Sequence, residues 1–90
     1  MTIAARDRAA LVRDEAVLVR DQARAVRDQM RAEARRLQDP AHRAAVIAEN
    51  RERGNDVTDA ELRELGPRLM RQADELDRQA DQLARQASEA

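Results

Sequence analysis

Apolar residues recur with a helical period through the first third of the chain. From Ala5 to Leu37 their spacings alternate between four and three, as in a heptad repeat whose a and d positions face a partner helix. The positions of this first seam are Ala5, Ala9, Val12, Ala16, Val19, Ala23, Val26, Met30 and Leu37. The pattern predicts a helix from about Ile3 to Gln38.

Glu33 occupies a d position of the first seam, between Met30 and Leu37. A polar residue in a seam can fix the register of two helices at some cost in stability. Alternatively, the seam ends near Met30 and Glu33 is exposed. The pattern leaves both interpretations open.

Asp39-Pro40 ends or sharply kinks this helix, because proline disfavours helical geometry in the residue before it. Proline suits the first position of a new helix, which Asp39 would cap. Gly54-Asn55 is typical of a left-handed helix stop. We therefore expect a short middle helix over residues 40–53.

Thr58 and Glu61 have the spacing of a capping box and predict a last helix over about residues 59–88. Its seam is Leu62, Gly66, Leu69, Ala73, Leu76, Ala80, Leu83, Ala87 and Ala90. Gly66-Pro67 interrupts the pattern, but the seam keeps its phase. We expect a kink at 66–67 without a full stop.

These elements predict an all-α fold, in which residues 1–90 form a single helical domain. Its core is an antiparallel, coiled-coil-like hairpin with an alanine-rich seam, and the short middle helix forms the bend. The first helix also carries apolar residues off its seam, which a lone hairpin would leave uncovered. They are the predicted interface with a partner or second copy: Ala10, Leu11, Val17 and Leu18. We expect a homodimer that forms a four-helix bundle.

The amino-acid composition excludes several kinds of functional site. Half of the apolar residues are alanine, and the chain has no Phe, Tyr, Trp or Cys. A disulfide scaffold, a cysteine zinc site and aromatic base stacking are therefore excluded. No segment has the 18 apolar residues that would suggest a membrane span, and the N-terminus lacks the pattern of a signal peptide, so a cytoplasmic protein is expected.

Every basic residue is arginine, and the net charge is −1. Residues 1–38 carry an excess of basic residues and residues 57–90 an excess of acidic ones, which favours pairing of the two ends. A stripe of five arginines follows one side of the first helix: Arg20, Arg24, Arg27, Arg31 and Arg35. The stripe could bind phosphates or an acidic partner. Alternatively, it is a solvated face with local ion pairs, or it rests on Asp74, Asp77 or Asp81 of the last helix.

His42 is the only histidine, so no metal site is expected. We expect His42 to lie on the surface. Nor do Gly54 and Gly66 make a glycine-rich phosphate loop. No Ser-His-Asp arrangement can be assembled around one remote histidine, and neither a cofactor nor enzyme activity is expected.

Arg6-Asp7, Arg13-Asp14 and Arg20-Asp21 each begin a heptad that continues toward an alanine. This run over residues 6–23 resembles the Arg-Asp-x-Ala heptads in linker helices of bacterial signalling proteins, notably some with cyclic-dinucleotide cyclase domains. The resemblance implies helical pairing. No cyclase or sensor domain accompanies it, so none of that activity carries over.

The function that follows is a non-enzymatic helical interaction module. It would self-associate and dock an unidentified protein, as a small adaptor, regulator or assembly subunit. The alternative is a small nucleic-acid-associated regulator that presents the arginine stripe to phosphates.

Overall fold

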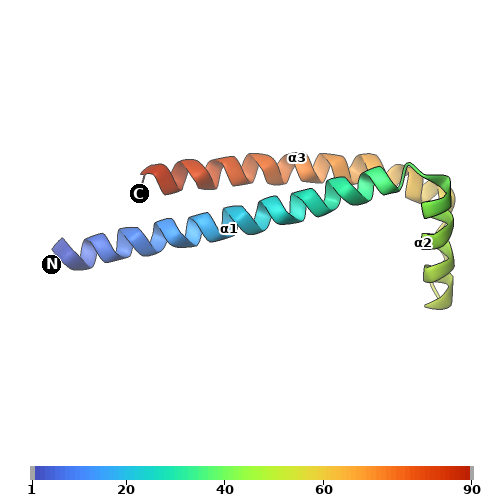
Figure 1. Cartoon of the computed structure of the whole chain (residues 1–90), viewed down its shortest axis with the longest axis horizontal. Coiled ribbons are helices and arrows are strands. Elements are labelled where there is room, and N and C mark those ends of the chain that lie inside the picture. Colours follow the sequence, from blue (N-terminus) through green and yellow to red (C-terminus); the bar gives the residue numbers. More distant parts are fainter. Residues whose placement is uncertain (1, 90) are drawn as a thin grey trace.

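The computed structural model describes the backbone of residues 2–89 and the side chains of residues 7–89. It contains three helices, α1 (Thr2–Arg36), α2 (Pro40–Glu52) and α3 (Asp59–Glu89). α1 and α3 lie side by side and antiparallel, while α2 projects from the end where they are joined (Figure 1). The predicted all-helical hairpin is confirmed. Ala5 and Ala90, at the outer ends of the two predicted seams, lie outside the described side chains.

Local signals set the ends of the helices. Asp39 accepts a hydrogen bond from the backbone N–H of Ala41 (2.9 Å), directly before Pro40 at the start of α2. Gly54 has φ 81°, the left-handed conformation that glycine adopts at low cost after a helix. Thr58 accepts from the backbone N–H of Glu61 (3.1 Å) at the start of α3.

α3 continues without interruption through Gly66-Pro67, whose proline lies inside the helix. Proline cannot donate the backbone hydrogen bond that the residue four positions earlier would accept. Glycine before it removes the Cβ that would otherwise crowd the proline ring. The pair is therefore accommodated within the helix.

Small residues form the contact between the two long helices. Gly66, Ala73, Ala80 and Ala87 are buried at the a position of four successive heptads of α3. Ala73 and Ala80 are 0% exposed. A Cβ placed on Gly66 would stand 3.6 Å from the backbone oxygen of Ala34 in α1, an ordinary van der Waals contact. The alanine seam of α3 therefore lies directly against α1.

α1 meets α3 through a different side than the first seam predicts. The valines at its d positions are exposed rather than packed against α3: Val12, Val19 and Val26. Ala16, Ala23 and Met30 at the a positions are half-buried, as are Arg20 and Arg27 at the e positions. The predicted a/d contact between the helices is therefore wrong for α1, which uses its a and e positions. The rotation brings its arginines over the acidic residues of α3.

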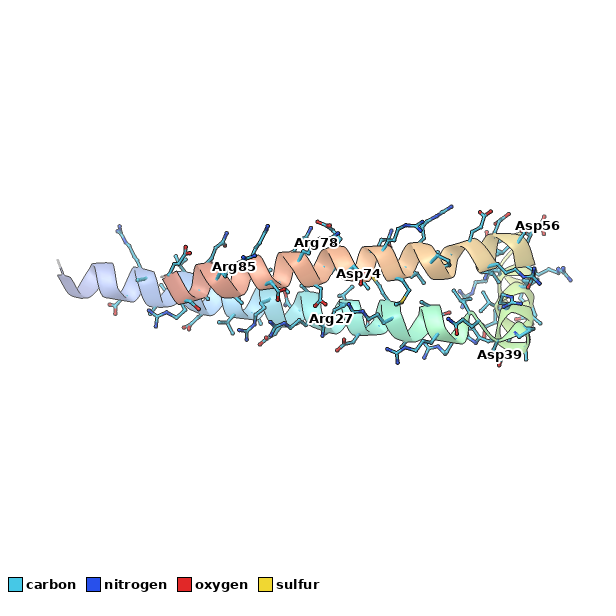
Figure 2. All side chains as sticks on the ribbon, turned by 90° about the horizontal axis from the view of Figure 1, so that it is seen from above. Arg27, Asp39, Asp56, Asp74, Arg78 and Arg85 are labelled. Carbon is cyan, nitrogen blue, oxygen red and sulfur yellow. The ribbon has the colours of Figure 1, made fainter. Side chains whose placement is uncertain are left out.

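The result is a thin, extended molecule (Figure 2). Its principal extents are 61 × 23 × 14 Å, and its radius of gyration is 19.2 Å, against about 12 Å for a compact domain of this length. α1 and α3 form a single layer, although protein domains usually bury their apolar faces between two layers. No helix in the described part of the chain is long and apolar enough to cross a membrane.

Candidate interaction surface

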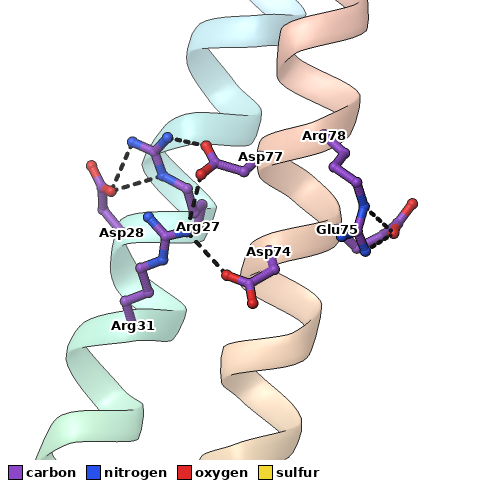
Figure 3. Close-up of polar contacts among 7 residues, drawn as sticks. All are labelled: Arg27, Asp28, Arg31, Asp74, Glu75, Asp77 and Arg78. Atoms are coloured by element: carbon purple, nitrogen blue, oxygen red, sulfur yellow. Dashed lines mark hydrogen bonds and ion pairs between the residues drawn. The ribbon is translucent and has the colours of Figure 1, made fainter.

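A network of ion pairs joins α1 to α3 along one edge of the hairpin. Arg27 donates a hydrogen bond to Asp77, and Arg31 donates to both Asp77 (3.0 Å) and Asp74 (3.2 Å) (Figure 3). Farther along, Arg24 and Asp81 approach to 4.0 Å. We call this the charged edge. Its pairs all fit one antiparallel register of the two helices.

The charged edge perturbs its own titratable groups. Hydrogen bonds from Arg27 and then from Arg31 hold the pKa of Asp77 below its ordinary value. The same bonds raise the pKa of both arginines. At neutral pH all three groups are therefore charged and engaged with one another.

Most of the arginine stripe is committed to carboxylates. Arg24, Arg27 and Arg31 meet the acidic residues of α3, as the interpretation of a stripe resting on the last helix expects. Arg20 pairs with Asp21 in its own helix (2.9 Å), and Arg35 is exposed. This engagement argues against the stripe as a phosphate-binding surface, because a phosphate would have to displace existing partners.

The joint between the helices is organised by Arg43 of α2, which is only 7% exposed. It donates to Asp59 of α3 (2.7 Å) and to the backbone oxygen of Leu37 (2.8 Å), which follows α1. Its hydrogen bond is the main reason why the pKa of Asp59 is lowered. One side chain therefore holds three segments together. The sequence pattern does not distinguish this residue, because it is one of 17 arginines.

His42 and Glu33 form a second tie between α1 and α2. A ring nitrogen of His42 lies 3.0 Å from Glu33 Oε1, and Glu33 Oε2 accepts from Arg36 (2.8 Å). Contact with His42, and then with Arg36, lowers the pKa of Glu33. Glu33 is half-buried, and its carboxylate pairs with His42 of α2 and with Arg36 of its own helix. His42 is also half-buried, and 29% of its side chain remains exposed beside Glu33.

The residues predicted as a partner interface fall into two groups. Ala10, Leu11 and Leu18 are exposed, and Leu11 and Leu18 keep 61% and 59% of their surface. Val17 is half-buried and lines a shallow, open groove of about 530 Å³ with Ala84 and Ala87 near the end of α3. The valines displaced from the predicted seam, Val12, Val19 and Val26, add to the exposed group.

Two causes leave the exposed leucines and valines of α1 uncovered by α3. The register places the first turns of α1 beyond the end of α3, so Leu11 and Val12 have no α3 residue opposite them (Figure 1). Farther along, the rotation toward the charged edge turns Val19 and Val26 away from α3. We define the outer apolar surface of α1 as Leu11, Val12, Leu18, Val19 and Val26, all exposed. It is the candidate interaction surface.

The exposed valines could have been anticipated from charge. An a/d contact would have kept Arg24 and Arg31, at the b positions, away from Asp81 and Asp74 of α3, with which they pair. In comparisons with known proteins, the chain matches no family model, no curated protein and no solved structure. The surface therefore has to be interpreted from its own geometry.

Proposed function

We propose that the chain is a non-enzymatic helical interaction module that self-associates and docks a protein partner, as a small adaptor, regulator or assembly subunit. The observation that carries this proposal is the outer apolar surface of α1. Each large aliphatic side chain gains about 1.5–3 kcal/mol when it is removed from water. A contiguous row of such side chains is typical of a surface that another helix covers.

The molecular shape supports the same proposal. The side chains that stabilise the hairpin internally are mostly alanine, which buries little apolar area. The larger Leu11, Leu18 and Val19 contribute little to the hairpin itself, since each keeps about half or more of its surface. A partner that covers them would supply the second layer that the single layer of α1 and α3 lacks.

Sedimentation equilibrium from about 1 to 100 μM, a range that brackets micromolar dissociation constants, tests the proposal. We expect a concentration-dependent mass above that of the monomer. The double variant Leu18→Glu/Val19→Glu should shift the mass to the monomer while circular dichroism still shows a helical protein. The control Ala44→Glu/Ala45→Glu adds the same charge at exposed positions of α2. A wild-type chain that stays monomeric throughout and still melts cooperatively would refute self-association.

A further inference from the structure

The face of the hairpin opposite the charged edge has no charged residue along its middle, although Glu33 and Arg36 border it near the end of α1. Asp77 follows Leu76 by one residue, so their side chains point about 100° apart around α3. The buried Ala73 and Ala80 lie between these two directions. Since Asp77 faces Arg27 and Arg31, the row of leucines at the d positions of α3 lies on the other side of the hairpin.

The d positions of α1 lie on that side of the hairpin as well. Val26 precedes Arg27 and is turned away from the charged edge, where it is 42% exposed. The d positions of both helices therefore share one face. The g positions next to them are glutamine at residues 22 and 29 of α1 and at 72, 79 and 86 of α3, whereas Arg36 occupies the g position in the last turn of α1. We call these residues the neutral face: Val19, Gln22, Val26, Gln29, Leu69, Gln72, Leu76, Gln79, Leu83 and Gln86.

The composition of the neutral face is unusual for this chain. Charged residues make up 39% of the sequence, yet the neutral face has none. Its glutamines are exposed, its valines are exposed, and its leucines are half-buried. Loss of charge at the centre of a surface is characteristic of a protein interface, whereas a solvated helix face is normally rich in charge.

We infer that the neutral face is where a second copy of this chain docks, face to face, to complete a four-helix bundle; this rests on the self-association proposed above. In such a bundle each helix contacts two neighbours, and residues at both a and d enter the core. The a positions are already used within the hairpin, at Ala73 and Ala80. The d positions, such as Leu76 and Val26, meet the second copy.

The exposed area of the chain fits a second copy as the occupant. A compact protein of 10.2 kDa exposes about 5,300 Å², whereas this chain exposes 6786 Å². Two copies that each covered the excess of about 1,500 Å² would bury about 3,000 Å² in total. That total lies within the roughly 2,000–5,000 Å² of permanent homodimers.

Charge also favours a second copy. Two copies of a face with a net charge repel each other when a twofold axis brings them together, whereas two neutral faces do not. Glutamine carries both a donor and an acceptor, so Gln79 can hydrogen-bond to another glutamine in either orientation. The charged edge stays at the side of the bundle, with Arg27 and Asp77 already satisfied within each copy.

Two variants test the neutral face: one places an arginine within it, and the other places an arginine just outside it. Gln79 and Gln82 are exposed in the same helix, but only Gln79 belongs to the neutral face. We expect Gln79→Arg to raise the dimer dissociation constant at least about tenfold, because an arginine would be buried without a partner. Gln82→Arg should leave the constant within about twofold, as surface substitutions do. Circular dichroism at high concentration checks that both variants stay helical.

A second variant tests the α1 half of the neutral face. Val26→Gln should also weaken the dimer, and it leaves the hairpin contact intact because Val26 is already exposed there. One outcome would refute the neutral face as the dimer contact and leave self-association supported. In that outcome Leu18→Glu/Val19→Glu weakens the dimer, whereas Gln79→Arg and Gln82→Arg both leave its dissociation constant almost unchanged. A wild-type monomer would overturn both.

Discussion

The close contact between α1 and α3 depends on the small size of the a-position residues in α3. Ala80 is 0% exposed, so a longer side chain there has no open direction. Ala80→Leu adds three carbons, which must either separate the helices locally or adopt a strained rotamer. Separation would also loosen the contact at Ala73 and the nearby pair of Arg27 with Asp77.

Overpacking of a filled contact costs about 1–3 kcal/mol. We expect Ala80→Leu to lie in the upper half of this range, at about 2–3 kcal/mol, because the hairpin is a single layer that cannot spread the strain to another one. For a domain of this size, each kcal/mol lowers Tm by about 4–8 °C. The expected decrease is therefore about 8–24 °C.

Thermal unfolding followed by circular dichroism at one fixed protein concentration measures this effect. Gln82→Leu is the matched control, since it puts the same side chain on an exposed position of α3. It should change Tm by only a few degrees, consistent with a surface change of about 0.5 kcal/mol or less. An Ala80→Leu variant as stable as the control would refute the close packing of α1 on α3.

Three further predictions concern charge, the joint and the helix interior. Because the pKa of Asp77 is lowered in the folded chain, its stabilising effect is complete above the unfolded value, about 3.9, and is lost as the pH falls through the folded value. Melts from pH 6 to 2 should show this loss, and Asp77→Asn should show a shallower one. Arg43→Met should cost about 1–3 kcal/mol in urea unfolding, because the backbone oxygen of Leu37 loses its donor. Pro67→Ala should stabilise by up to about 3 kcal/mol in the same assay, since Pro67 is exposed inside a helix; no gain would show that the proline itself is needed for packing.

The fold was largely predictable because its signals are local. Asp39-Pro40, Gly54 and Thr58 act on backbone hydrogen bonds within a few residues of themselves, so they mark helix ends whatever surrounds them. α1 ends at Arg36 rather than at Gln38, and α2 ends at Glu52 rather than at Arg53. Such small differences arise because the last turns of helices are weakly held.

The candidate surface was only partly predictable. Leu11 and Leu18 were expected to be uncovered and are exposed. Val19 and Val26 were assigned to the hairpin contact, because heptad spacing shows that a residue faces some neighbour without showing which one. The joint at Arg43 and the pair of His42 with Glu33 depend on where α2 turns, and no sequence pattern carries that direction.

The sequence by itself therefore determined where helices form, the heptad period of α1 and α3, and the alanines that let them approach closely. Only the tertiary structure decided which side of α1 faces α3. That choice goes with long-range charge pairing: Arg24 and Arg31, at b positions, pair with Asp81 and Asp74 when α1 turns its a and e positions inward. The same rotation leaves Val19 and Val26 at the surface, where the heptad pattern still calls for a neighbouring helix.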